Sequence, residues 1–199
     1  STSTTTRIFP WPVAPLPARR NGFVTFGCFN NLAKINPSVL SLWTEVLAAI
    51  PDARLLMVTK ALGDPCMERR YREAFAAGGV GDRVLFSGMV PHRELLGRYG
   101  DVDVALDPFP YSGGLTTLES LWMGVPVITL GGERFASRHS LSHLCAAGLP
   151  ELIAEDRAGY VAKAVSLAGD LSRLGNMRGL LRERLAASPL CDAPRFTRN

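Results

Sequence analysis

The sequence lacks several features that mark well-defined classes of protein. Only four cysteines occur in 199 residues, Cys28, Cys66, Cys145 and Cys191, and no two of them form a C-x-x-C pair. This spacing favours neither a disulfide framework nor a zinc site, so we expect reduced thiols. The sequence also has no G-x-S-x-G elbow and no Walker lysine motif, and therefore gives no support to a hydrolase or a P-loop nucleotidase.

Long apolar runs and dense charge of one sign are missing as well. No run approaches the roughly 20 apolar residues that a membrane-spanning helix needs. Charged residues make up 20% of the chain, and the arginines behind its net charge of +4 are spread along it. We therefore expect a globular protein that binds neither membrane nor nucleic acid, but suits a small anionic ligand. The first residues contain no apolar signal core, which favours a cytoplasmic location.

From about residue 23 onward, short apolar segments alternate with segments of helical character. We expect strands at 23–28, 54–59, 83–86, 102–106 and 125–130, and helices at 37–50, 65–77, 92–99, 115–123 and 137–147. This alternation predicts an α/β fold, a Rossmann-like parallel sheet with helices on both faces. Residues 1–21 are rich in Ser, Thr and Pro without a period, so we expect a linker or arm there and one domain over 22–199.

The most informative segment joins the strand at 102–106 to the next helix through two adjacent glycines, Gly113 and Gly114. Glycine lets the backbone turn and approach a ligand closely. The first N–H groups of a helix that opens at Leu115 lack intrahelical partners and lie at the positive end of the helix dipole. Thr116 and Thr117 would add hydroxyl donors there, so this helix start predicts a phosphate site.

Other candidates lie in the neighbouring loops, because ligands of open parallel sheets bind outside the carboxyl ends of the strands. Glu119 lies one turn into the helix, where its carboxylate can accept hydrogen bonds from a ribose. Asn31 and Lys34 follow the first strand, and a lysine there can neutralise charge on a leaving diphosphate without a metal. His92 and Arg98 follow the third strand and are candidates for contact with a nucleobase.

One pair of histidines has a metal-binding spacing. His139 and His143 are four residues apart on an expected helix, an arrangement that can hold a metal when a third ligand is present. No glutamate lies between them as in H-E-x-x-H. We therefore expect no metal and no cofactor.

Together these segments resemble the C-terminal half of the catalytic region of O-linked N-acetylglucosamine transferases, including bacterial relatives with tetratricopeptide repeats. The similarity extends from about residue 23 to residue 189. It rests on F-G-C-F-N-N-L-A-K-I-N-P at 26–37, D-V-A-L-D at 103–107, G-G-L-T-T-L-E-S-L-W-M-G-V-P at 113–126, A-S-R at 136–138 and G-L-P-E-L-I-A at 148–154. The resemblance implies the C-terminal domain of a GT-B glycosyltransferase, in which residues 22–199 hold the nucleotide sugar, usually UDP-GlcNAc.

The resemblance also implies roles for individual residues. Lys34 corresponds to the family's diphosphate-contacting lysine and is our candidate catalytic residue, while Asn31 corresponds to a glutamine of the same loop. Thr116 belongs to the family's Thr-Thr pair, and Glu119 corresponds to an aspartate that holds the ribose.

The candidates beside the base depart further from the family pattern. His92 takes the place of a lysine beside the base, and Arg98 corresponds to an arginine near the uracil. Leu95 stands where the family usually has a histidine that stacks on the uracil, and glycine or leucine replaces the histidine before the Thr-Thr pair. GDP-fucose, used by a plant branch of the family, therefore stays an alternative donor.

The function implied is that of the donor-binding half of an inverting, metal-independent transferase that moves GlcNAc to Ser or Thr of a protein acceptor. The first GT-B domain, which carries the candidate base, and the tetratricopeptide repeats are not in this sequence, so we expect the isolated chain to bind donor without turnover. The alternatives are a non-catalytic module that binds a nucleotide sugar or scaffolds a partner, and a transferase with another donor, or with asparagine or a small molecule as acceptor.

Overall fold

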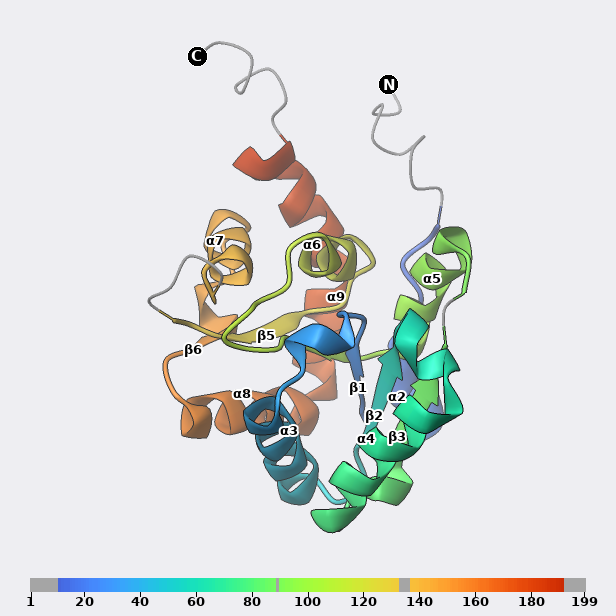
Figure 1. Cartoon of the computed structure of the whole chain (residues 1–199). Helices are drawn as coiled ribbons and strands as arrows, with labels where there is room; N and C mark the ends of the chain where they lie inside the picture. Colours follow the sequence, from blue (N-terminus) through green and yellow to red (C-terminus); the bar gives the residue numbers. More distant parts are fainter. Residues whose placement is uncertain (1–10, 89, 133–136, 192–199) are drawn as a thin grey trace.

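A single parallel sheet organises the molecule (Figure 1). The computed structural model describes residues 11–88, 90–132 and 137–191, apart from the side chains of residues 92 and 93. The strands lie in the order β3-β2-β1-β4-β5-β6, and every pair is parallel. Their bounds are β1 Thr25–Cys28, β2 Arg54–Val58, β3 Val84–Ser87, β4 Val104–Leu106, β5 Val127–Leu130 and β6 Ile153–Ala154. The predicted α/β, Rossmann-like architecture is confirmed.

Capping residues mark the starts of α3 (Pro37–Ala49) and α4 (Pro65–Ala77). Asn36 and Asp64 each precede a proline at the first helical position, and each side chain accepts a backbone N–H of the first turn. The described helices are α2 (Pro17–Asn21), α3 (Pro37–Ala49), α4 (Pro65–Ala77), α5 (His92–Arg98), α6 (Leu115–Trp122), α7 (His139–Ala146), α8 (Arg157–Gly169) and α9 (Leu171–Ala187).

The strand order reverses at β1, and this reversal determines which face of the sheet each helix covers. Because parallel crossovers are right-handed, α3 and α4, which lead from β1 to β2 and β3, lie on one face of the sheet. The path from β4 to β5 runs in the opposite direction, so α6 lies on the other face. α8 packs against α3 on the first face, and α9 packs against α6 on the second.

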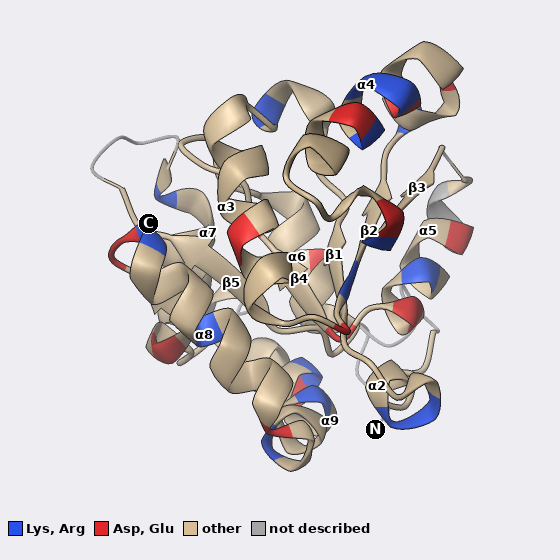
Figure 2. Ribbon diagram, turned by 90° about the horizontal axis from the view of Figure 1, so that it is seen from below, with Lys and Arg blue, Asp and Glu red and all other residues tan. Residues whose placement is uncertain are grey.

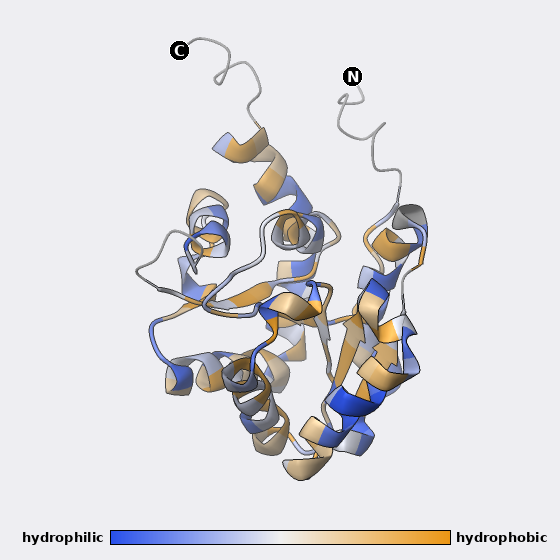
Figure 3. Cartoon of the chain, in the orientation of Figure 1, coloured by the Kyte–Doolittle hydropathy of each residue, from blue (hydrophilic) through white to orange (hydrophobic). Residues whose placement is uncertain are grey.

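The core lies between the sheet and these helices. Nearly every side chain of β1, β2 and β4 is buried, which accounts for their continuous apolar sequences. Figure 3 shows the hydrophobic colour gathered on the strands. On α4, basic residues lie beside Glu68 and Glu73, whereas the charged residues of α9 are arginines apart from Glu183 (Figure 2). No described helix is long and apolar enough to cross a membrane.

The described part of the expected arm, residues 11–21, packs on the domain. Residues 17–21 form α2, although the sequence shows no helical period there. Leu16 and Ala18 are buried, and the Ala18 N–H donates to Asp103 Oδ1 at 2.9 Å. The other carboxylate oxygen of Asp103 accepts the N–H of Thr25, the first residue of β1, at 2.8 Å. Asp103 therefore joins this segment to the sheet.

Candidate functional site

Two loops meet at the carboxyl ends of adjacent strands. β1 and β4 pair in register through Phe26 with Val104 and Gly27 with Ala105, and the loops that follow them cover residues 29–36 and 107–114. These strands lie where the strand order reverses, so the two connections leave toward opposite faces of the sheet. Such a switch point is where open α/β sheets bind ligands.

The two glycines before α6 have different surroundings. The Gly113 N–H donates to Asp107 Oδ1 at 2.7 Å, and a Cβ at this position would lie 2.5 Å from Thr117 Oγ1. A Cβ on Gly114 would meet nothing within 4 Å. Close packing therefore demands glycine at 113, whereas Gly114 has open space beside it.

The N-terminus of α6 has no side-chain cap. Gly114 stands at the N-cap position, and within the described part of the chain the N–H groups of Leu115 and Thr116 have no acceptor. Unpaired N–H groups at the positive end of a helix dipole attract an anion. This is the helix start that the sequence predicts as a phosphate site, although its use by a ligand stays a prediction.

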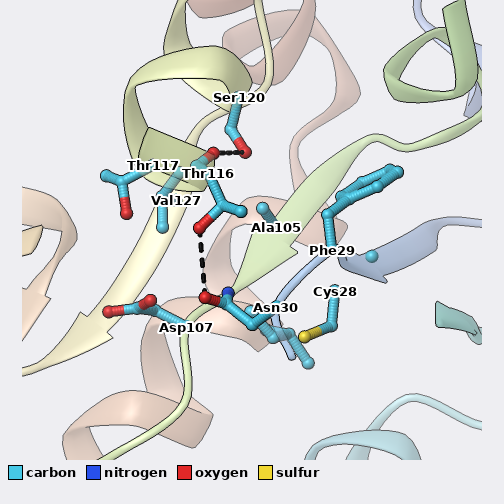
Figure 4. A pocket seen from close by; sticks show the side chains of 11 residues that line it. Cys28, Phe29, Asn30, Ala105, Asp107, Thr116, Thr117, Ser120 and Val127 are labelled. Carbon is cyan, nitrogen blue, oxygen red and sulfur yellow. Dashed lines mark hydrogen bonds between the residues drawn. The ribbon is translucent and has the colours of Figure 1, made fainter. Parts of the chain in front are cut away.

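The two threonine hydroxyls have protein partners, and Figure 4 shows that of Thr116. Thr116 Oγ1 donates to Asn30 Oδ1 at 3.1 Å, and buried Thr117 shares a 2.7 Å hydrogen bond with Ser140 Oγ. A cavity of only about 10 Å³ separates these side chains from the ends of β1 and β4, which is room for at most one water. In this structure Thr117 faces α7 rather than the solvent, and donation from either threonine to a phosphate stays a prediction.

Lys34 lies at the glycine loop, as the sequence predicts. Its Nζ donates to the Ser112 carbonyl at 3.0 Å and lies 4.5 Å from the centre of the exposed Tyr111 ring. Burial lowers the pKa of Lys34, and the charge of Asp107 opposes that shift. Asn31 lies in the same loop but is exposed, and its Oδ1 accepts the N–H of Ala33 at 2.9 Å. In this structure it caps the short 3-10 turn that carries Lys34.

Asp107 is a completely buried carboxylate beneath the glycine loop. Besides the Gly113 N–H, it accepts the hydroxyl of Thr129 at Oδ2, 2.7 Å away. Burial raises its pKa to about 6, although the hydrogen bonds from Thr129 and Gly113, the neighbouring Ser140 hydroxyl and the charge of Lys34 act in the opposite direction. Its carbonyl accepts the Tyr160 hydroxyl at 3.1 Å. Asp107 is therefore held at both its backbone and its side chain.

Glu119 lies one turn into α6 and is buried. Its Oε2 accepts the Tyr99 hydroxyl at 3.1 Å, and the Tyr99 ring stacks on Phe29 with centroids 3.9 Å apart. Burial and the neighbouring Glu119 charge raise the pKa of Tyr99 well above its ordinary value. Glu119 also borders a hollow of about 210 Å³ with mostly apolar walls, lined further by Leu96, Leu115, Leu118, Trp122, Leu185, Leu190 and Cys191.

The candidates for base contact lie on α5. Arg98 Nε is 3.5 Å from Asp101 Oδ2, and among the described residues no hydrogen bond or ion pair joins Arg98 to the glycine loop. The His92 backbone opens α5, but its side chain lies outside the described residues. On α7, burial and neighbouring His139 lower the pKa of His143. The described residues contain no group of His, Cys, Asp and Glu side chains suited to a metal.

Sequence reasoning missed three residues of this site, Asn30, Asp107 and Ser140. Asp107 is predictable from the sequence, because a carboxylate directly after a buried strand lies at the carboxyl edge of the sheet. Asn30 also follows its strand closely, but the sequence analysis predicts the adjacent Asn31 in its place. Ser140 had no local signal, since only the fold brings α7 against the start of α6.

Comparisons with known proteins agree with this geometry. Residues 16–199 match the family model described as Glycosyl transferase family 41. A Petunia hybrida protein, "Probable UDP-N-acetylglucosamine--peptide N-acetylglucosaminyltransferase SPINDLY", is 43% identical over 192 residues, which cover 94% of this chain and 20% of that protein. The UDP-N-acetylglucosamine--peptide N-acetylglucosaminyltransferase of Caenorhabditis elegans is 34% identical over 173 residues, covering 87% and 15%. The chain thus spans about a fifth or less of the length of these relatives.

Solved structures show the same relationship. A mutant of the Thermobaculum terrenum O-GlcNAc transferase matches with a TM-score of 0.85 and 43% identity, over 94% of this chain and 35% of that one. The pneumococcal O-GlcNAc transferase GtfA, in complex with UDP and GlcNAc, matches with a TM-score of 0.60 and 19% identity over 88% and 34%, a likeness of fold alone. On the strength of the family model and these relatives, the chain belongs to glycosyltransferase family 41.

Proposed function

We propose that this chain is the donor-binding half of an inverting transferase that moves GlcNAc from UDP-GlcNAc to Ser or Thr of proteins. The meeting of Lys34 with the uncapped start of α6, at the switch point of the sheet, carries the proposal. One ammonium group and several unpaired N–H groups at one place suit a diphosphate. Membership of family 41 supports the choice of a nucleotide sugar as the ligand.

The proposed reaction is a direct displacement at the anomeric carbon. The acceptor oxygen forms its bond to that carbon while the bond to the diphosphate oxygen breaks, so negative charge grows on the departing UDP. Lys34 exchanges its neutral acceptor, the Ser112 carbonyl, for a charged phosphate oxygen, and the N–H groups at the start of α6 share that charge. These groups stabilise the leaving diphosphate without a metal, and Glu119 accepts hydrogen bonds from the ribose.

The remaining parts of the enzyme would come from chain that this sequence does not contain. The proposed acceptor is a protein, and the base that takes its hydroxyl proton would reside in the other GT-B domain. Tetratricopeptide repeats are the proposed source of acceptor binding. The relatives' greater length supports this division of labour.

Titration of the purified chain with UDP by calorimetry, without added metal and with GDP in parallel, tests the proposal. We expect saturable UDP binding, weakened about tenfold or more by Lys34→Ala, because a hydrogen bond to a charged group contributes about 1.5–3 kcal/mol. Lys163→Ala is the matched control, since Lys163 Nζ also donates to a backbone carbonyl, that of Glu151 at 2.7 Å, but lies on α8.

Three results would contradict this proposal in different ways. If the folded protein binds neither nucleotide, the proposed donor site is refuted. Tighter binding of GDP than of UDP would replace the uridine donor by a guanosine one. If Lys34→Ala binds UDP as tightly as the wild type does, Lys34 does not contact the donor.

A further inference from the structure

The peptide unit between Ser112 and Gly113 has a hydrogen-bond partner on each side. In the unit between Ser112 and Gly113, the N–H donates to the buried Asp107 carboxylate at 2.7 Å. This unit is trans, and the C=O of a trans peptide points away from its N–H. The Ser112 carbonyl therefore points to the opposite side, where Lys34 Nζ donates to it at 3.0 Å.

The next peptide unit has the reverse orientation. The Gly113 carbonyl accepts from Ser140 Oγ at 3.0 Å, and Ser140 is completely buried. The Ser140 hydroxyl also neighbours the Asp107 carboxylate, so both inner partners of the loop lie together. Because this unit is trans as well, the Gly114 N–H points outward, to the same side as the Ser112 carbonyl and Lys34.

Two further hydrogen bonds fix Ser140 in the position from which it holds the Gly113 carbonyl inward. Its hydroxyl oxygen shares the 2.7 Å hydrogen bond with Thr117, and its N–H donates to Ser112 Oγ at 3.3 Å. Since Ser140 Oγ donates toward Gly113, the Thr117 hydroxyl supplies the hydrogen of their shared bond. α7 thus holds the loop before α6 at Ser112 and Gly113, and holds the first turn of α6 at Thr117.

We propose that Ser140 is a positioning residue of the donor site: by holding the Gly113 carbonyl inward, it aims the Gly114 N–H at the diphosphate. The inference rests on the proposed function, because it needs a diphosphate beside Lys34. Without the Ser140 hydroxyl, the Gly113–Gly114 peptide can rotate, and glycine permits that rotation at little cost. The outward N–H is then lost as a preorganised donor.

The test compares Ser140→Ala with Ser188→Ala in UDP and GDP titrations by calorimetry. Ser188 is the matched control, a buried serine whose Oγ donates to the Leu185 carbonyl at 2.7 Å, at the end of α9. We expect Ser140→Ala to weaken nucleotide binding about tenfold and Ser188→Ala to leave it unchanged, with similar losses of thermal stability. Ser140→Cys, which replaces the hydroxyl by a larger group that is a weaker donor, repeats the measurement without a cavity and should weaken binding in the same direction.

A second readout separates positioning from general support of the fold. In ¹H–¹⁵N spectra, the Gly114 amide of the wild type should shift strongly when nucleotide is added, and this shift should shrink in Ser140→Ala. If the wild type binds nucleotide while Ser140→Ala and Ser140→Cys bind it equally well with the same Gly114 shift, the inference fails and the proposed function stands. If the folded wild type binds neither UDP nor GDP, both fail.

Discussion

At the scale of single residues, Asp107 makes the folded protein sensitive to pH. Its carboxyl is buried against the glycine loop, and burial raises its pKa from 3.8 to about 6. Because the folded-state pKa lies above the unfolded value, the folded protein binds the proton more tightly than the unfolded chain. The stabilisation from that proton is present below about pH 4 and is lost as the pH rises to about 6.

Replacing Asp107 by the isosteric Asn should remove this dependence. An Asn oxygen can still accept the Gly113 N–H, and its amide can donate to Thr129, so the loop keeps its hydrogen bonds. As the pH falls from 7 to 4, we expect the wild type to gain up to about 3 kcal/mol of unfolding free energy relative to Asp107→Asn. Urea unfolding of both proteins at several pH values measures the difference, and parallel stability profiles would contradict the prediction.

The residues that sequence analysis could find are those whose chemistry is visible in a short segment. Gly113, Gly114 and Glu119 lie within seven residues of one another, and Lys34 lies in the loop that follows its strand. Ser140 and the Thr117 hydroxyl that it fixes are 23 positions apart, and no period or motif connects them. The sequence therefore indicated the glycine loop and its lysine, while the hydrogen bonds that orient the loop depend on tertiary packing.

At the scale of elements, two glycines with positive φ follow the ends of helices, and a side chain at one of them would be far more crowded than at the other. Gly124 follows α6 with φ 79°, and a Cβ there would lie 2.5 Å from Val13 Cγ1 and 2.8 Å from the Arg178 carbonyl. Gly148 follows α7 with φ 69°, and a Cβ there would meet nothing within 4 Å. The left-handed conformation is common to both turns, but crowding affects only the first.

Alanine at each position should separate these two effects. We expect Gly148→Ala to lower the unfolding free energy by about 1 kcal/mol, the cost of a left-handed alanine. Gly124→Ala should lose about 3 kcal/mol or more, because overpacking adds to that cost. Urea unfolding measures both values, and equal losses would show that the neighbours of Gly124 move aside freely.

Element boundaries were predictable where a cap or a glycine marks them. α4 covers the expected 65–77, and α7 ends just before Gly148, where the sequence predicts a stop. The strand expected at 102–106 is shorter, because Val102 is buried without joining the ladder of β4, and an apolar pattern does not separate these two states. The five residues of α2 are too few to show a helical period.

At the scale of the whole molecule, α9 fastens the N-terminal segment to the sheet. The Arg178 side chain is 2% exposed, and its guanidinium donates to the carbonyls of Ala14, Val102 and Tyr99 at 2.6, 2.8 and 3.4 Å. Burial lowers its pKa, while the charge of Asp103 acts against that shift. One side chain thus joins three segments that are distant in sequence.

Removal of this guanidinium should destabilise the entire domain. We expect Arg178→Met to lower the unfolding free energy by about 3 kcal/mol, because it leaves buried carbonyls without donors and Asp103 without its cation. Arg184→Met, an exposed position on the same helix, should change it by less than about 0.5 kcal/mol. Thermal and urea unfolding measure both variants, and a loss as small as that of Arg184→Met would show that other groups hold the segment.

The adjacency of β1 and β4 also has a consequence during synthesis. These central strands are neighbours in the sheet, yet nearly 80 residues separate them in the chain, and Ser140 lies a further 34 residues beyond the end of β4. Contacts of such long sequence separation form slowly, and a nascent chain cannot make them before its later part has left the ribosome. Nucleotide affinity should therefore be absent from chains released before α7 has emerged, which would make bound nucleotide a marker for the completion of folding.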